Sequence, residues 1–440
     1  MSKLGDHIEY VKGFAFKSKD YTETGIPVIR VSNFTDNSID IKDVYHIPKE
    51  RFSEFQKVNL IKDDIVIATV GSWPTNPSSV VGKTIRVPPE ANNTLLNQNA
   101  VRIRSLDKDE QLYFYYVLKD KSFSDYIIST AQGSANQASI TLKSILDYDL
   151  PNIDSKEKRI KIGKTLATYD EKIQLNTQIN QTLEQIAQAL FKSWFVDFDP
   201  VRAKVQALSD GLSLEQAELA AMQAISGKTP EELTALSQTQ PDRYAELAET
   251  TKAFPCEMVE VDGVEVPKGW EVKYLKDICN IVYGKNLPTT KLIKEGYPVF
   301  GGNGVIGYYD KFLYETPQTL VSCRGAASGK VLYSLPYSFV TNNSLVIEHE
   351  KSGLSYFYIY EALKLQNLTE LTSGSAQPQM TIANMASVQI LVPSEKINEV
   401  YKKYADKLYD KKYQNNIENE ALAQTRNLLL PRLLSGDFND

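Results

Sequence analysis

The sequence predicts an α+β protein in which two pseudo-repeated mixed α/β domains are joined by two long antiparallel coiled-coil helices. Three observations predict this fold. An uninterrupted heptad pattern runs from Asp154 to Phe195, and the same pattern returns at a constant offset of 239 residues (Ile162 to Tyr401). The segments that precede the two patterns also resemble each other. The expected order along the chain is therefore domain, helix, domain, helix.

The first pattern steps alternately by four and three residues, which is the period of a coiled-coil seam. Asn176 and Asn180 interrupt the apolar seam, and Asn415 and Asn419 stand at the same places in the second helix. A buried Asn selects one register, because other registers leave its amide unsatisfied. The alternative is that these asparagines mark a frayed, solvent-facing turn. The residues predicted to form a rigid spacer or to dock a partner are Ile162, Leu166, Ile173, Asn176, Asn180, Leu183, Leu190, Trp194, Asn415, Asn419, Leu422, Leu429 and Leu433.

Composition limits the classes to which the chain can belong. Its 440 residues are 42% hydrophobic, which is enough for more than one core. There is no apolar run long enough to cross a membrane and no signal peptide after Met1, so a cytoplasmic protein without a membrane partner is expected. Cys256, Cys279 and Cys323 form no CxxC pair, which indicates neither a zinc site nor a disulfide framework.

The net charge of -6 is unevenly distributed along the chain. Residues 205–268 carry 4 basic and 12 acidic groups, whereas residues 1–204 carry 27 and 26 and residues 269–440 carry 18 and 17. Helix-start signals at Ser213, Thr229 and Pro241 predict a small helical insert in the acidic segment. Repulsion should keep its acidic face away from a phosphate backbone, so a protein is its expected neighbour.

The repeat extends into the domains. With an offset of 271 (Leu4 to Leu275), Gly13 and Gly25 match Gly284 and Gly296. Short apolar runs bounded by Gly, Asn and Pro predict strands, with helical stretches between them. The expected strands are residues 25–31, 64–70, 100–103, 319–322 and 344–347, and the expected helical stretches are residues 110–129 and 354–366.

The sequence gives little support for a catalytic motif. The glycines of Phe300 to Gly304 match one loop of S-adenosylmethionine-dependent methyltransferases, but a lone glycine pattern is weak and fits a turn after a strand better. Three Gly-Lys-Thr triplets lack the glycine that a phosphate loop needs five positions earlier. The three histidines lie in unrelated contexts. We therefore predict no catalytic residue and no metal site.

Loop-like stretches instead combine Arg, Lys, Asn, Gln and aromatic side chains in both copies. Such side chains bind phosphates and base edges in a DNA groove, although an ordinary polar loop explains any single one of them equally well. The DNA-binding candidates are Lys12, Phe14, Lys17, Lys19, Arg30, Asn33, Ser72, Trp73, Asn97, Gln98, Asn99, Gln132, Ser134 and Asn136 in the first copy, and Lys285, Asn286, Asn303, Tyr308, Arg324, Lys330, Asn342, Asn343, Ser375 and Gln377 in the second.

Three motifs give the chain a family resemblance. These are LFKSWFVDFDP at the end of the first helix (Leu190 to Pro200), LLPRLLSGD at the end of the second (Leu429 to Asp437) and PKGW before the second copy (Pro267 to Trp270). With the duplicated domain and helix, they resemble the specificity subunit of type I restriction-modification systems. The resemblance implies target-recognition domains at 1–151 and 269–392, spacer helices at 152–204 and 393–440, and the acidic insert at 205–268.

The resemblance also implies a function. Each domain would recognise one half of a split, asymmetric target in double-stranded DNA, and the helices would fix the gap between the halves. Two modification subunits would dock for adenine methylation, and motor-endonuclease subunits would join for restriction. S-adenosylmethionine, ATP and Mg would then bind only in the partner subunits. Two alternatives stay open from sequence alone: a structural coiled-coil adaptor, and a self-contained methyltransferase that uses Phe300 to Gly304.

Overall fold

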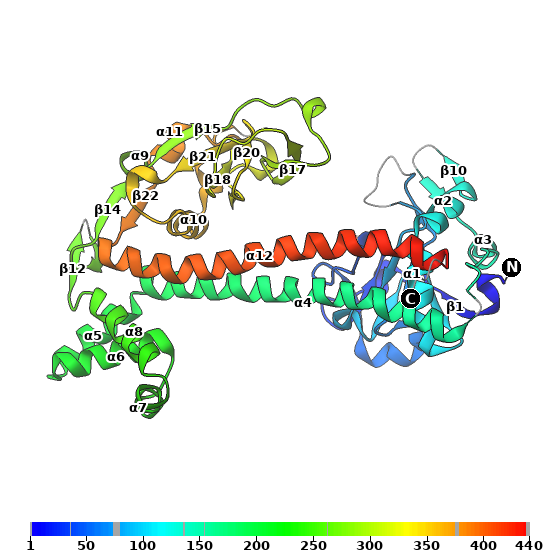
Figure 1. Cartoon of the computed structure of the whole chain (residues 1–440), viewed down its shortest axis with the longest axis horizontal. Helices are drawn as coiled ribbons and strands as arrows, with labels where there is room; N and C mark the ends of the chain where they lie inside the picture. Colours follow the sequence, from blue (N-terminus) through cyan, green and yellow to red (C-terminus); the bar gives the residue numbers. More distant parts are fainter. Residues whose placement is uncertain are drawn as a thin grey trace. The chain divides into compact units, whose positions relative to one another are not determined.

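The computed structural model describes residues 2–35, 37–73, 80–134, 137–153, 155–261, 263–374 and 378–436 (Figure 1). It forms two compact units, one of Met1–Asn176 with Ile417–Asp440 and the other of Thr177–Asn416. We call them unit 1 and unit 2. The two long helices, α4 (Lys156–Phe195) and α12 (Glu395–Leu434), each contribute one segment to each unit.

Unit 1 is built from two main sheets. One has the strand order β1-β9-β5-β7 and the other β3-β2-β8-β4, with β2 and β8 parallel; a smaller sheet has the order β10-β11-β6. The strands are β1 (Ile8–Lys12), β2 (Ile26–Ile29), β3 (Tyr45–Ile47), β4 (Asn59–Leu60), β5 (Ile65–Ala68), β6 (Val70–Gly71), β7 (Thr84–Arg86), β8 (Thr94–Leu96), β9 (Ala100–Ser105), β10 (Gln132–Ser134) and β11 (Gln137–Ser139). The helices are α1 (Gln111–Lys119), α2 (Lys121–Ser129), α3 (Leu142–Leu146) and the first half of α4.

Strand β5 is buried on both faces, and this burial explains why its residues are apolar at every position. Ile65 and Ile67 face a core shared with α1, α4 and the end of α12, whereas Val66 and Ala68 face a second core with the other sheet. A strand buried on both faces needs apolar residues at successive positions. The predicted helical stretch 110–129 is two helices, because Asp120 ends α1 and its carboxylate caps α2 by accepting from the Ser122 N–H.

Unit 2 repeats this topology after the insert. Its main sheets have the orders β15-β21-β18-β19 and β17-β16-β20, again with one parallel pair, β16 with β20. The strands are β14 (Glu271–Tyr274), β15 (Asn280–Tyr283), β16 (Tyr297–Gly301), β17 (Gly304–Tyr309), β18 (Thr319–Ser322), β19 (Val331–Tyr333), β20 (Phe339–Val340), β21 (Ser344–Glu348) and β22 (Gln389–Val392). The helices are α9 (Leu275–Ile278), α10 (Tyr356–Lys364) and α11 (Ile382–Ala386). The predicted duplication is therefore present in the sheet topology itself.

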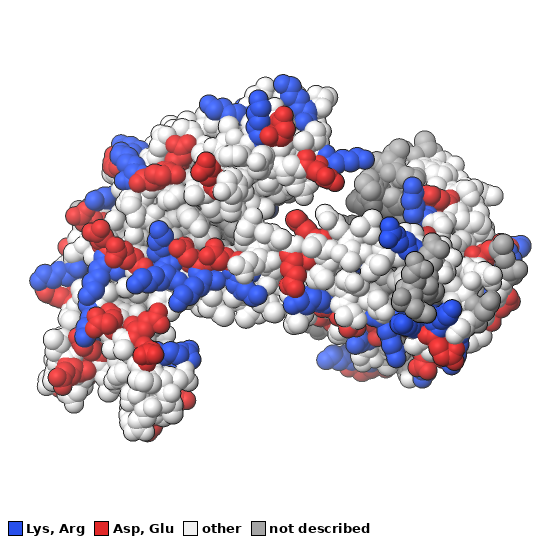
Figure 2. Space-filling view, viewed as in Figure 1, with Lys and Arg blue, Asp and Glu red and all other residues white. Residues whose placement is uncertain are grey.

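The acidic insert is helical, as expected, and also contains a hairpin. Its predicted start at residue 205 lies inside a helix, α5 (Asp199–Ser209), because α4 ends at Phe195 and not at residue 204. The elements that follow are α6 (Leu214–Ser226), α7 (Pro230–Thr239), α8 (Pro241–Ala253), β12 (Met258–Val261) and β13 (Val264–Pro267). Ser213 and Thr229 form the expected capping boxes with Gln216 and Glu232. Buried Lys204 donates to the main-chain oxygens of Thr251 and Phe254 and so ties α5 to the end of α8. Figure 2 shows acidic side chains over this part of the chain.

Helices α4 and α12 pair antiparallel within each unit. In unit 1, the Asn176 amide donates to Glu418 at 2.7 Å and to Asn419 at 3.0 Å. In unit 2, Asn180 donates to Asn416 at 2.8 Å and accepts from Asn415 at 2.9 Å. Asn176, Asn180 and Asn415 are buried, so the alternative of a solvent-facing turn does not describe them.

The other predicted seam residues also lie inside the helix pairs. Ile162 and Leu166 are fully buried in unit 1, and Trp194 is fully buried in unit 2. The half-buried seam residues are Ile173, Leu183, Leu190, Asn419, Leu422, Leu429 and Leu433. Asp154, where the predicted first helix begins, and Asp437, the last residue of one quoted motif, lie outside the described residues.

Candidate nucleic-acid interface

In unit 1, the candidate loops meet at one edge of the two main sheets. They follow β1, β2, β5 and β8, and main-chain hydrogen bonds join them. These bonds run from Gly13 N–H to Ala100 O (3.0 Å), from Phe14 N–H to Leu96 O (2.9 Å), from Asn97 N–H to Ile29 O (2.9 Å) and from Thr69 N–H to Asn99 O (2.9 Å).

Unit 2 contains the same four bonds between the equivalent loops. They run from Gly284 N–H to Ser344 O (3.1 Å), from Lys285 N–H to Val340 O (2.9 Å), from Thr341 N–H to Phe300 O (2.8 Å) and from Cys323 N–H to Asn343 O (3.0 Å). We call these bonded loops the loop framework. Its backbone is shared by the two units, and most of its side chains are not: Phe14, Asn97 and Gln98 of unit 1 correspond to Lys285, Thr341 and Asn342.

Two glycines allow the framework to close. A Cβ atom on Gly13 would lie 1.9 Å from the main-chain oxygen of Asn97, and one on Gly284 would lie 2.3 Å from that of Thr341. No side chain fits at such distances. The matching glycines that the sequence shows in the two copies are therefore explained by close approach of the backbone.

Most candidates of unit 1 reach solvent. The exposed candidates are Lys12, Phe14, Lys17, Lys19, Gln98, Asn99, Gln132 and Ser134. The half-buried candidates are Arg30, Ser72, Trp73 and Asn97, and Asn136 lies outside the described residues. Asn33 is a correction, because it is buried. Its amide donates to the Asp43 main-chain oxygen and its side-chain oxygen accepts from the Arg30 N–H, so it supports its own loop instead of facing a groove.

Three further candidates of unit 1 lie away from the framework. Lys17 and Lys19 belong to the short 3-10 turn around Ser18–Asp20. Trp73 donates from its indole nitrogen to the main-chain oxygen of Ser134 at 2.8 Å. This bond joins the loop after β6 to β10, so Trp73 positions a second loop pair.

In unit 2, most candidates are exposed as well. Lys285, Asn286, Asn303, Arg324, Lys330 and Asn343 are exposed, Asn342 and Tyr308 are half-buried, and Ser375 and Gln377 lie outside the described residues. The Lys330 ammonium group donates to the Asn303 side-chain oxygen at 2.5 Å, which brings the loops after β16 and β18 together. Tyr308 lies within β17, opposite Pro298, and not at the loop edge.

The buried Cys323 lies beneath the exposed Arg324. Its thiol donates to the Asn342 main-chain oxygen at 3.4 Å, and burial raises the pKa of the thiol. A thiol with a raised pKa is a poor nucleophile. Cys323 therefore supports the loop that carries Asn342.

Sequence reasoning missed one exposed stack in unit 1. The Arg30 guanidinium lies 4.2 Å from the centre of the Tyr45 ring, and Tyr45 stacks on Tyr21 with centres 4.5 Å apart. Tyr45 comes from β3, whereas Arg30 follows β2. Only the antiparallel pairing of these strands brings the two side chains together, so no local sequence pattern indicates it.

The Phe300 to Gly304 stretch is a hairpin. Its residues end β16 and begin β17, with Gly301 opposite Gly304. A Cβ atom on Gly302 would meet the Ser322 hydroxyl oxygen at 2.8 Å. These glycines therefore serve a tight turn and close packing, as the turn interpretation of the sequence proposes.

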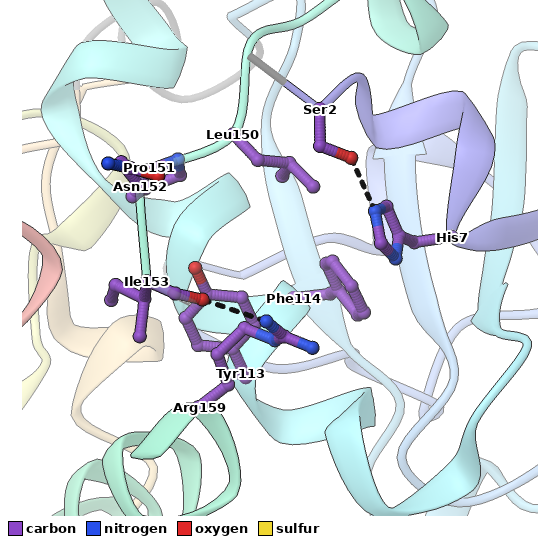
Figure 3. A pocket seen from close by; sticks show the side chains of 9 residues that line it. All are labelled: Ser2, His7, Tyr113, Phe114, Leu150, Pro151, Asn152, Ile153 and Arg159. Atoms are coloured by element: carbon purple, nitrogen blue, oxygen red, sulfur yellow. Dashed lines mark hydrogen bonds between the residues drawn. The ribbon is translucent and has the colours of Figure 1, made fainter. Parts of the chain in front are cut away.

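A cavity of about 220 Å³ opens in unit 1 where the domain meets the start of α4 (Figure 3). The Ser2 hydroxyl and the His7 ring are 2.6 Å apart, and Arg159 donates to the Ile153 main-chain oxygen at 2.8 Å and to Glu110 at 2.6 Å. None of the DNA-binding candidates lines this cavity. Arg159 of α4 therefore joins the helix to the domain at this cavity.

The described residues contain neither a membrane-spanning helix nor a cluster of metal ligands. None of their helices has both the length and the apolar character that a bilayer crossing requires. Within the same ranges, no three His, Cys, Asp or Glu side chains are grouped so that they would hold a metal ion.

Two copies of one loop framework, each attached to a long helix and each with its own exposed side chains, define a protein with two related recognition domains. The family model described as type I restriction modification DNA specificity domain matches residues 1–185 and 267–424. The chain belongs to this family. The match omits residues 186–266, which include the end of α4 and nearly all of the acidic insert, and residues 425–440.

Individual relatives agree with the family. The chain is 45% identical over 357 residues to the type I restriction enzyme HindI specificity subunit of Haemophilus influenzae, covering 74% of this chain and 77% of that protein. It is 23% identical over 350 residues to the MjaIX specificity subunit of Methanocaldococcus jannaschii, covering 74% and 68%. The crystal structure of a type I S subunit from M. genitalium has the same fold, with a TM-score of 0.55, 18% identity and coverage of 98% and 94%.

The family confirms the resemblance seen in the sequence. The chain is a specificity subunit of a type I restriction-modification system, a DNA-recognition subunit and not an enzyme. Such subunits work with DNA and with the other subunits of the system.

Proposed function

We propose that the chain recognises a bipartite, asymmetric target in double-stranded DNA, with one half-site bound by each domain. The loop framework carries this proposal, because four equivalent main-chain bonds hold the loops in both units while the side chains on them differ. A shared backbone with different donors and acceptors presents different hydrogen-bonding patterns to base edges. The two half-sites would therefore differ in sequence.

Helices α4 and α12 would set the number of unspecified base pairs between the half-sites. Their seam is continuous, and buried amides select its register in both units. A fixed register gives the helix pair a fixed length, as a spacer requires.

The chemistry would belong to partner subunits. In this proposal two modification subunits dock on the helices for adenine methylation, and motor-endonuclease subunits join them for restriction. S-adenosylmethionine, ATP and Mg²⁺ would bind in those partners, and the complex would act in the cytoplasm. The near-neutral charge of residues 1–204 and 269–440 suggests that much of the phosphate affinity also comes from the partners.

A methylation map tests the proposal. The chain would be co-expressed with its modification subunit, and methylated adenines would be mapped genome-wide with and without it. We expect a bipartite motif that requires the chain and that changes in one half when residues 1–150 are exchanged for those of another specificity subunit. Methylation that does not depend on the chain, or a continuous symmetric motif, would contradict the proposal and favour a structural adaptor.

A further inference from the structure

Because the two helices have the same seam pattern, α4 could pair either with α12 or with α4 of a second chain. At the offset of 239, Asn176 corresponds to Asn415 and Asn180 to Asn419, so both helices carry the same pair of amides. If two α4 helices from different chains paired in the native register, Asn176 of one would meet Asn180 of the other. The hydrogen bonds between these four amides therefore select the register but do not distinguish α4 paired with α12 from two like helices paired together.

Charged side chains make that distinction in unit 1. Asp170 of α4 forms an ion pair with Arg426 of α12, and it also accepts a hydrogen bond from the Tyr116 hydroxyl at 2.6 Å. The two charged side chains are only 17% and 13% exposed, so water screens their interaction weakly. The residue of α4 that corresponds to Arg426 is Ala187, which offers Asp170 no positive charge.

Unit 2 shows the same arrangement with the same signs. Glu184 of α4 binds Lys412 of α12 at 2.8 Å and Lys364 of α10 at 2.6 Å. The residue of α4 that corresponds to Lys412 is Ile173. In both units the carboxylate comes from α4 and its helix partner is a cation of α12.

We propose that these charges select which helices pair. Asp170 and Glu184 on α4, with Arg426 and Lys412 on α12, favour the union of the two different helices over the union of two α4 helices from separate chains. Pairing of two α4 helices would place Asp170 against Ala187 and Glu184 against Ile173. Each carboxylate would then lose a cation while it remains partly buried, which is strongly unfavourable.

Two neighbouring contacts define the limits of this selection. The nine residues of α1 and α10 correspond in order, so Lys119 matches Lys364, and Glu184 would keep one of its two cations in the wrong pairing. The Asp170 site therefore contributes most. Pairing of two α12 helices would bring Arg426 to Tyr409, which is hydrogen bonded to Glu361, so the selection acts chiefly against pairs of α4.

An exposed ion pair provides a matched control. Lys172 lies 3.5 Å from Glu418, but both side chains are more than 40% exposed. Such pairs contribute little to stability. The residue of α12 that corresponds to Lys172 is Lys411, so this pair would also survive in a union of two α12 helices.

Two full-length variants test the proposal. Arg426→Asp places two carboxylates opposite each other within one chain, and Asp170→Arg places two guanidinium groups opposite each other in another. When the two variants are co-expressed with different tags, α4 of each finds an oppositely charged α12 on the other. We expect a 1:1 complex whose recovery through both tags exceeds that of two differently tagged wild-type chains by about a hundredfold.

The controls make each outcome decisive. The variants Lys172→Glu and Glu418→Gln, of which the second keeps an acceptor for the Asn176 amide, should remain as separate as the wild type when they are co-expressed in the same way. Each charge variant expressed alone should give less soluble protein, and co-expression should restore the yield. If the two charge variants fold separately with wild-type thermal stability, or remain insoluble together, the proposal is wrong. The readout is assembly, so it does not depend on DNA recognition.

Discussion

Asn415 donates a hydrogen bond from its side-chain amide to the side-chain oxygen of Asn180 at 2.9 Å, and both side chains are buried. Asn180 in turn donates to Asn416 at 2.8 Å. A buried amide that loses its partner costs about 1–3 kcal/mol, so a shift of either helix by one turn is unfavourable. The amides therefore reduce the apolar contact between the helices, but they permit only one register.

Replacement of Asn176 and Asn180 by Leu should keep the helices paired but loosen their register. The apolar seam would become more continuous, and shifted registers would no longer leave these amides unsatisfied. In the assembled complex, the methylated motif should then tolerate more than one gap between its half-sites. Sequencing of methylated adenines measures this directly.

The control for that prediction replaces Gln178 and Gln181 of the same helix by Leu. Both side chains are exposed, so this change should leave the register and the gap preference intact. A gap preference that stays as sharp in the double Asn→Leu variant as in the wild type would remove the register role from Asn176 and Asn180.

Replacement of Gln98 and Asn99 by Ala should change the specificity of one half-site only. Both side chains are exposed on the loop framework of unit 1, whereas the main-chain oxygen of Asn99 accepts the Thr69 N–H bond that holds the loop. Loss of a good base contact costs about 1–3 kcal/mol of discrimination. The methylated motif should become degenerate in that half and remain unchanged in the other.

The matched variant replaces Asn342 and Asn343 with Ala, at the equivalent places in unit 2. It should relax the opposite half-site. Equal loss of binding to all sequences in both variants would instead assign these residues to phosphate contacts.

The long helices and the duplication could be predicted because their signals are local. A heptad seam and a repeat offset both lie in the order of residues, and neither depends on how distant segments meet. The burial of Asn33 could not be predicted, because its partner Asp43 follows after a turn that has no regular period. The contact of Arg30 with Tyr45 was likewise missed, since it depends on strand pairing.

Gly163 has a packing role that the sequence did not indicate. The Gly-Lys-Thr triplet that begins at Gly163 lies within helix α4 and does not form a phosphate loop. The missing glycine five positions earlier indicated this. A Cβ atom on Gly163 would lie 2.5 Å from the main-chain nitrogen of Tyr113, so the glycine allows α1 to pack against α4. Such close contact between two helices is set by tertiary structure and leaves no periodic signal in the sequence.

Gly13→Ala should destabilise the protein by more than about 2 kcal/mol, because the new methyl group would collide with the Asn97 main-chain oxygen. Gly284→Ala should have a similar effect through Thr341. Chemical unfolding measures both. Gly227→Ala is the control: its φ is +66° and no atom lies within 4 Å of the added Cβ, so only about 1 kcal/mol of backbone strain is expected. Equal effects at all three sites would remove the steric argument.

The buried Glu361 should make the stability of the protein fall as pH rises. Burial raises the pKa of Glu361 above its ordinary value of 4.5, although the Tyr409 hydroxyl and Lys364 oppose the shift. The folded protein therefore holds this proton more tightly than the unfolded chain. Its stabilising contribution is complete below pH 4.5 and is lost as pH increases through the raised pKa. Glu361→Gln, which keeps an acceptor for Tyr409, should weaken this dependence in chemical unfolding measured at several pH values.

Glu184→Gln should change the pH dependence of the free energy of unfolding in the direction opposite to that of Glu361→Gln. Burial acts to raise the pKa of Glu184, but the hydrogen bonds from Lys364 and Lys412 outweigh it and hold the pKa below 4.5. Glu184 therefore contributes stability above that pH, and the contribution is lost as pH falls through the lowered pKa. The Gln variant should be less stable than the wild type at neutral pH and closer to it in acid. If both variants shifted the profile in the same direction, the opposite roles of the two carboxyl groups would be wrong.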